Sequence, residues 1–193
     1  MKKVIILIGP IRTGKSTIAK LLSEKLNYPR FRMDILKHEY YKEIGYNETY
    51  GAEIQKKEGF IALYRYLRPF DVYAVKRALQ DCSFGIIDFG GGLSVYENNT
   101  LLDLVEQELK AYENVILLLP SQDKQESIDL LNKRMREKEY REYFKDDGIN
   151  DRMYLNKLFI EHTSNLKLAK HIFYTKDKSP EQTANEIIRN LSL

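Results

Sequence analysis

The chain has 193 residues, of which 43% are hydrophobic, 11% aromatic and 31% charged, and its 31 basic and 28 acidic residues give a net charge of +3. This composition excludes an intrinsically disordered chain, and the charge balance is too even to indicate a nucleic-acid partner. The apolar runs are far shorter than the roughly 20 residues that a membrane-spanning helix needs. We therefore expect no membrane partner, and the single cysteine favours a reducing, cytoplasmic location.

Five short segments have the continuous aliphatic character of strands that are covered on both faces. They are Val4–Ile8, Arg30–Met33, Phe84–Asp88, Val115–Leu119 and Ile172–Thr175. Amphipathic helical patterns lie between or after them at Lys15–Leu26, at Thr100–Tyr112 and from Pro180, with Ser179 as the N-cap of the last helix. This alternation predicts an α/β fold, a doubly wound parallel sheet flanked by helices, as one domain over residues 1–193.

Two stretches hold more sequence than this core requires. Residues 34–80 contain much helix-forming sequence between the second and third strands. Residues 133–152 are densely charged and include Gly148 in a polar turn. The second stretch is either a solvated surface helix with its loop or a mobile basic lid.

The segment that follows the first strand fits the phosphate-binding pattern G-x-x-x-x-G-K-[ST] without a mismatch, and it opens a helix as the pattern requires. Backbone N–H groups of such a loop form an anion site at a helix N-terminus. We expect Lys15, as a surface cation, to reach the β- and γ-phosphates of ATP and the Ser16 hydroxyl to ligate Mg²⁺. The expected nucleotide-binding residues are Gly9, Pro10, Ile11, Arg12, Thr13, Gly14, Lys15, Ser16 and Thr17.

A predicted strand that ends in a carboxylate is a second feature that supports nucleotide binding. The predicted strand 84–88 is apolar and ends in Asp88, which is typical of a Walker B strand. An aspartate beside the first strand can hold Mg²⁺, usually through water. The alternative is that Asp88 caps the glycine-rich loop after it.

The order of these features resembles the shikimate kinase family over nearly the whole chain. Asp34 after the second strand and Gly90-Gly91-Gly92 after the third carry most of the likeness. The resemblance implies a five-stranded parallel sheet in the order 2-3-1-4-5, a helical acceptor-binding region at 34–80, an ATP lid at about 133–152, and transfer of the γ-phosphoryl group of ATP to a ring hydroxyl.

The resemblance also implies roles for single residues. Asp34 is expected to orient or deprotonate the acceptor hydroxyl, although it is also a suitable N-cap for a helix over 35–43. Gly90, Gly91 and Gly92 are expected to bring backbone close to the acceptor. Arg134 would stack on adenine and Arg141 would contact phosphate, with Arg136 or Arg152 as alternatives. Arg65 or Arg68 would bind the acceptor.

The sequence departs from the family at two positions. The family's Asp-Thr-Asp stands here as Arg32-Met33-Asp34, and the arginine that holds the substrate carboxylate falls near Glu161, beside His162. We therefore expect an acceptor other than shikimate, such as a polyol, a nucleoside or a cationic compound, with Glu161 and His162 in its site.

These observations predict an ATP- and Mg²⁺-dependent kinase of a small-molecule hydroxyl, acting as a monomer or homodimer. A nucleoside or nucleoside-monophosphate kinase is the alternative within enzymes. A nucleotide-switched ATPase or regulator, without a small acceptor, is the alternative outside them.

Overall fold

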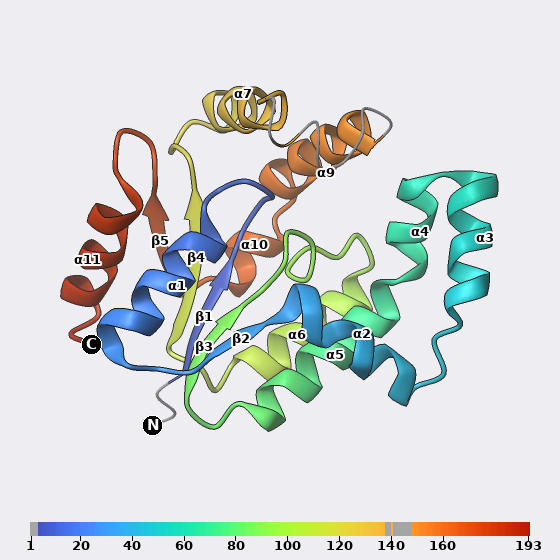
Figure 1. Cartoon of the computed structure of the whole chain (residues 1–193), viewed down its shortest axis with the longest axis horizontal. Coiled ribbons are helices and arrows are strands. Elements are labelled where there is room, and N and C mark those ends of the chain that lie inside the picture. The colour runs from blue at the N-terminus through green and yellow to red at the C-terminus, as the bar shows by residue number, and fades with distance from the viewer. Residues whose placement is uncertain (1–3, 138–139, 141–147) are drawn as a thin grey trace.

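A five-stranded parallel sheet lies at the centre of the part of the chain that the computed structural model describes, residues 4–137, 140 and 148–193. The strand order β2-β3-β1-β4-β5 confirms the predicted order (Figure 1). The strands are β1 (Val4–Ile8), β2 (Arg30–Arg32), β3 (Gly85–Asp88), β4 (Asn114–Leu119) and β5 (His171–Tyr174).

Helices cover both faces of this sheet (Figure 1). Their bounds are α1 (Lys15–Leu26), α2 (Met33–Glu43), α3 (Glu48–Glu58), α4 (Phe60–Tyr66), α5 (Arg68–Asp81), α6 (Asn99–Leu109), α7 (Lys124–Met135), α9 (Ile149–Glu161), α10 (Ser164–Leu168) and α11 (Pro180–Asn190). None of these described helices is both long enough and apolar enough to cross a membrane.

Alternation along β1 explains the two-sided core. Side chains of successive strand residues point to opposite faces of a sheet. Ile6 and Ile8 therefore pack in one apolar cluster with α5 and α6, while Ile5 and Leu7 pack in another with α1 and α11. All four side chains are fully buried, as expected for a central parallel strand.

The predicted segments differ from the observed elements by a few residues at their ends, and α6 ends at Leu109 rather than at Tyr112. Met33 begins α2 instead of ending β2, and Phe84 precedes β3 and is 41% exposed. Ile172 in the edge strand β5 is also 40% exposed. An edge strand has a neighbour on one side only, so continuous apolar sequence there does not require full burial. At α11 the prediction is confirmed, because Ser179 forms a capping box with Gln182.

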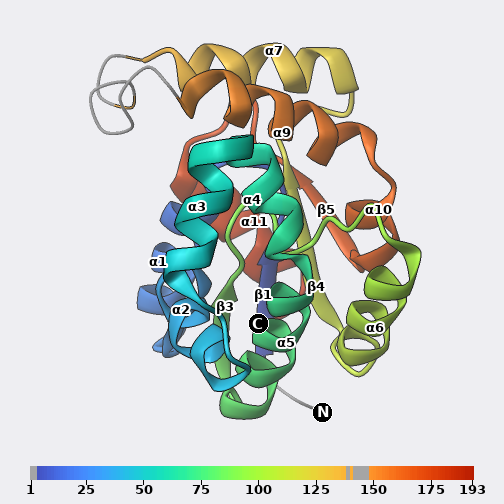
Figure 2. The same cartoon turned by 90° about the vertical axis from the view of Figure 1, so that its right-hand side faces the viewer.

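The long stretch between β2 and β3 forms four helices, α2 to α5. The pair α3 and α4 projects beyond the end of the sheet, far from α1 and α11, and the two helices lie side by side in both views (Figures 1 and 2). Helices α7 and α9 pack on each other across the carboxyl end of the sheet (Figure 2). The glycine-rich loop after β3 lies with α4 and α9 around one cavity.

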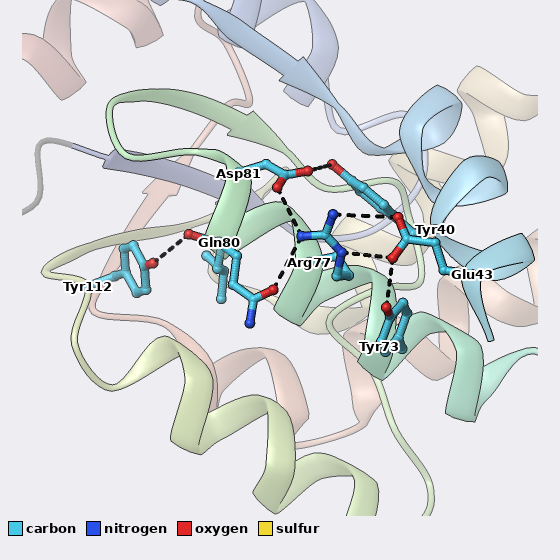
Figure 3. A network of polar contacts seen from close by, with 8 residues as sticks. Tyr40, Glu43, Tyr73, Arg77, Gln80, Asp81 and Tyr112 are labelled. Atoms are coloured by element: carbon cyan, nitrogen blue, oxygen red, sulfur yellow. Dashed lines mark hydrogen bonds and ion pairs between the residues drawn. The ribbon is translucent and has the colours of Figure 1, made fainter.

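A polar network fixes α2 against α5 (Figure 3). Arg77 Nε donates to Glu43 Oε2 at 2.8 Å, and its Nη1 donates to Asp81 Oδ1 at 2.9 Å. Tyr40 donates its hydroxyl to Asp81 at 2.9 Å, and Tyr73 donates to Glu43 at 2.7 Å. Burial, followed by the bond to Asp81, raises the pKa of Tyr40 to about 12. This network sets the position of α2 relative to α5, and both helices carry residues that the sequence assigned to the acceptor.

Candidate functional site

The P-loop begins directly after β1 and its shape depends on unusual backbone angles. Gly9 has a φ of 134°, and a Cβ there would lie 2.4 Å from the carbonyl oxygen of Leu118. Only glycine fits at this position. Gly14 occupies the N-cap position of α1 with a φ of 92°, and between them Arg12 adopts a φ of 68°. A side-chained residue rarely adopts such an angle, so the surroundings must hold the loop in this conformation.

Lys15 is the first residue of α1, and its side chain is buried rather than at the surface as predicted. Its Nζ donates to the carbonyl oxygen of Pro10 at 2.5 Å because the loop folds over it. Burial lowers the pKa of Lys15 to about 8, and the charge of Asp88 opposes this shift. A phosphate beside Lys15 would stabilise its charged form. Ser16 and Thr17 follow in the first turn of α1, and both are exposed.

Asp88 ends β3 beside β1, where it pairs with Leu7 in the strand register. Its carboxylate is 4% exposed and forms an ion pair with Arg30 through Oδ2, so it does not cap the glycine-rich loop. The other oxygen, Oδ1, is buried and has no hydrogen-bond partner in the described structure. A buried unpaired carboxylate oxygen is a suitable acceptor for a water molecule in the shell of a Mg²⁺ ion.

A cavity of about 300 Å³ lies beside the P-loop. Arg134 reaches it from the end of α7, and its Nη1 donates to the carbonyl oxygen of Arg12 at 3.0 Å. Arg12 in turn donates to Glu137 at 2.5 Å. We name this space the nucleotide-side cavity; its lining is Arg12, Thr13, Gly14, Ile18, Arg134, Glu137, Thr175, Lys178, Pro180 and Thr183.

Sequence reasoning missed the contribution of the loop between β5 and α11 to this cavity. In the sequence, Thr175 and Pro180 mark only the end of a predicted strand and the start of a predicted helix. The carboxyl ends of parallel strands lie at one edge of a sheet, so the position of Thr175 after β5 was a usable signal. Its hydroxyl oxygen is buried and has no hydrogen-bond partner in the described structure.

The predicted lid is described only in part. Arg141 lies outside the described residues. Of the alternatives, Arg136 is exposed after α7 and does not line the cavity. Arg152 is on α9, donates to the carbonyl oxygen of Gly148 at 2.9 Å and lies over the ring of Phe60 at 5.0 Å.

A second cavity of about 180 Å³ adjoins the P-loop at Ile11. Gly90, Gly91 and Gly92 line it as predicted by their position after β3, and so does Arg68. We name it the acceptor-side cavity. Its lining is Ile11, Lys37, Phe60, Tyr64, Leu67, Arg68, Asp71, Gly90, Gly91, Gly92, Leu93, Leu155 and Phe159.

Most donors of Arg68 are already occupied. Its Nε donates to the carbonyl oxygen of Tyr64 at 2.9 Å and its Nη1 to that of Gly92 at 2.7 Å, while its Nη2 forms an ion pair with Asp71. Tyr41 also donates its hydroxyl to Asp71, which is 1% exposed. Asp71 thus neutralises the charge of Arg68 in the lining of the acceptor-side cavity. The N–H groups of the guanidinium point to protein groups rather than into the cavity.

The structure does not bring the other arginine or Asp34 into this lining. Arg65 is 56% exposed and pairs with Glu97 at 3.2 Å. Asp34 is 53% exposed and pairs with Arg32 at 2.9 Å. The predicted helix cap is wrong, because α2 begins at Met33 and Asp34 therefore lies inside its first turn.

Glu161 and His162 also lie apart from the acceptor-side cavity. Glu161 is 52% exposed and lies 3.9 Å from Lys157 on the same helix. His162 lines a separate space between α9, α10 and β4, where its Nδ1 is 2.8 Å from Ser164 Oγ. The structure therefore does not place Glu161 or His162 in the acceptor-side cavity, where the sequence predicted them.

Asn156 is a further residue that sequence reasoning missed. It is fully buried on α9, and its side chain binds the backbone of Ile11 in the P-loop. No motif surrounds it in the sequence. Only the folded chain shows the contact.

The sequence of this chain matches the model of a known protein family. The family model described as shikimate kinase matches residues 12–192. No curated protein sequence matches this chain.

Solved structures share the fold at low identity. The shikimate kinase from Acinetobacter baumannii, in complex with shikimate, has a TM-score of 0.61 and 17% identity over 98% of this chain and 93% of its own. That from Bacteroides thetaiotaomicron has a TM-score of 0.62 and 18% identity over 98% of both chains. That from Aquifex aeolicus has a TM-score of 0.56 and 22% identity over 98% of this chain and 96% of its own.

Proposed function

Because this chain belongs to the shikimate kinase family and is therefore a P-loop kinase, we propose that it transfers the γ-phosphoryl group of ATP to a hydroxyl of a small molecule. The observation that carries the proposal is the placement of two adjacent loop residues. Arg12 lines the nucleotide-side cavity and Ile11 lines the acceptor-side cavity. A donor and an acceptor bound in these cavities would meet at the P-loop, and such positioning supplies much of phosphoryl-transfer catalysis.

On the nucleotide side, Lys15 would hold the β-phosphate and the transferred γ-phosphoryl group of ATP and lose its bond to Pro10. Ser16 and Asp88 fit a Mg²⁺ ion, since one offers an exposed hydroxyl in the first turn of α1 and the other an unpaired carboxylate oxygen. The ion, when bound, would neutralise phosphate charge. Arg134 would border the nucleotide base.

On the acceptor side, Gly90, Gly91 and Gly92 would bring backbone close to the acceptor. We retain Asp34 as the proposed base or orienter of the hydroxyl, because it lies at the carboxyl end of β2 on the helix that also carries Lys37. Lys37 is a cation of this lining for which the described structure shows no ion pair. One unpaired cation and a largely apolar wall suit a compact, hydroxyl-bearing acceptor.

We propose an acceptor other than shikimate, because the arginines near this cavity are not available to a carboxylate. Arg68 is engaged by Asp71 and by three backbone carbonyl groups, and Arg65 does not line the cavity. Neither arginine therefore presents two free N–H groups to a carboxylate. Arginine in proteins commonly binds a carboxylate through two parallel hydrogen bonds. The apolar and aromatic lining, which includes Phe60 and Tyr64, favours a nucleoside as the second candidate.

The test is a screen for acceptor-stimulated ATP turnover. Purified protein with Mg²⁺ and ATP is incubated with shikimate, polyols, nucleosides and nucleoside monophosphates, and ADP and phosphorylated products are measured. We expect one class to stimulate turnover well above the acceptor-free rate. Turnover that no compound stimulates would favour the nucleotide-switched ATPase, and saturable phosphorylation of shikimate at sub-millimolar KM would contradict the acceptor proposal.

A further inference from the structure

Asn156 binds both polar groups of one P-loop residue, although it lies 145 residues away in the sequence. The Ile11 N–H donates to Asn156 Oδ1 at 2.8 Å, and Asn156 Nδ2 donates to the Ile11 carbonyl oxygen at 3.2 Å. The Asn156 side chain is 0% exposed. Since the amide must accept from one group and donate to the other, these two bonds fix its orientation.

These bonds act where the loop most needs external support. The next residue, Arg12, has the left-handed φ of 68°. The carbonyl oxygen of Arg12 accepts a bond from Arg134 at 3.0 Å. The strained dipeptide 11–12 is therefore held by α9 on one side and by the end of α7 on the other. In the described part of the chain, the backbone of Ile11 makes no hydrogen bond other than those to Asn156.

We propose that Asn156 is a positioning residue that keeps the P-loop in the shape that binds nucleotide. This inference rests on the proposed function, since it assumes that the loop takes phosphate. Asn156 itself would contact no phosphate and would act only through Ile11. Its neighbours on α9, Leu155 and Phe159, line the acceptor-side cavity, so one helix supports both cavities.

The test compares two buried asparagines. Asn156→Leu keeps the branching and the number of side-chain heavy atoms and removes both bonds to Ile11. Asn165→Leu is the control, because Asn165 is 2% exposed on α10 and donates to the carbonyl oxygen of Phe159 at 2.8 Å, away from the P-loop. We expect both variants to lose thermal stability. Only Asn156→Leu should weaken binding of a non-hydrolysable ATP analogue with Mg²⁺, by roughly ten- to a hundredfold in calorimetry.

A kinetic readout separates positioning from general damage. In acceptor-free ATP hydrolysis, the KM of Asn156→Leu for ATP should rise by a similar factor, while kcat at saturating ATP stays within about threefold of wild type. Asn165→Leu should change neither parameter by more than about twofold.

Several results would overturn the inference. The inference is wrong if Asn156→Leu folds and binds the ATP analogue as tightly as wild type. It is also wrong if Asn156→Leu and Asn165→Leu lose equal affinity for the analogue. If Asn156→Leu does not fold, Asn156→Asp serves in its place, because it keeps an acceptor for the Ile11 N–H and loses the donor to the Ile11 carbonyl oxygen. Asn156→Asp with wild-type affinity would likewise overturn it. Wild-type protein that binds no nucleotide would instead refute the proposed function.

Discussion

The side chain of Ile11 fills the space that a side chain on Gly91 would need. A Cβ at Gly91 would lie 2.3 Å from Ile11 Cγ1 and 3.2 Å from Ile11 Cα, whereas a Cβ at Gly90 would meet nothing within 4 Å. The P-loop and the glycine-rich loop after β3 are thus in direct contact at one position. Rotation of the Ile11 side chain would move Cγ1 but would leave Cα and Cβ 3.2 Å away, and the bonds to Asn156 hold the backbone that carries them.

Gly91→Ala should therefore destabilise the protein where Gly90→Ala does not. We expect Gly91→Ala to lower the free energy of unfolding by about 1–3 kcal/mol, which is typical of overpacking, and to weaken nucleotide binding through the displaced loop. Gly90→Ala should change stability by less than about 0.5 kcal/mol. Urea unfolding of the two variants measures this difference, and equal midpoints would show that the contact with Ile11 has no energetic weight.

Lys15 should make nucleotide affinity depend on pH. Its pKa is lowered to about 8, and phosphate favours the charged form. The affinity for Mg²⁺-ADP should therefore be nearly constant between about pH 7 and 7.5 and weaken above pH 8, approaching tenfold per unit. Calorimetry at a series of pH values measures this slope.

Lys15→Met is the control for that slope. It should bind nucleotide weakly and without the fall above pH 8. In the ligand-free protein the unfolded state binds the Lys15 proton more tightly than the folded state does, so wild type should gain stability relative to Lys15→Met as the pH rises above about 8. A variant that binds nucleotide like wild type would refute the role of Lys15.

Arg30 should matter for stability because its partner is buried. Arg30→Leu leaves the Asp88 carboxylate, which is 4% exposed, without its ion pair. We expect the free energy of unfolding to fall by about 3 kcal/mol. Asp88→Asn leaves a neutral amide instead of a charge, so it should lower the free energy of unfolding by less than Arg30→Leu does. The double variant Arg30→Leu/Asp88→Asn should recover part of the loss, which unfolding measurements on the four proteins would detect. Strictly additive losses would mean that the pair does not contribute as a unit.

Asp34 should affect turnover more than nucleotide binding. Loss of a general base typically lowers kcat by 10²–10⁴-fold, so Asp34→Asn should fall in this range once an acceptor is identified, with nucleotide affinity within about twofold. Glu39→Gln is the matched control, since Glu39 is an exposed carboxylate on the same helix that pairs with Lys42 at 2.9 Å. An Asp34→Asn protein with more than about half of wild-type kcat would leave Asp34 only as the partner of Arg32.

Sequence alone predicts the parts of this protein whose signals are local. The strand Val4–Ile8 and the helix Lys15–Leu26 have the predicted bounds, because an apolar run and a complete loop pattern determine them. The order of the sheet followed from the resemblance to a family. The burial of Lys15 was not predicted, since it depends on how the loop folds over the side chain.

Tertiary packing determines the rest of the site. Arg65 and Arg68 are three residues apart and look equivalent in the sequence, yet α4 turns one to solvent and α5 directs the other to the acceptor-side cavity. Asp71 and Asn156 have no motif around them. Their importance arises from contacts with Tyr41, 30 residues away, and with Ile11, 145 residues away.

The contact between Ile11 and Asn156 also has a consequence for biosynthesis. The loop that would bind phosphate is made well before α9, the helix that holds it, because 145 residues separate Ile11 from Asn156. Contacts between such distant segments form late and slow folding. A nascent chain that ends before α9 should therefore have the P-loop sequence without high affinity for nucleotide, so that ligand binding begins only after α9 has been made.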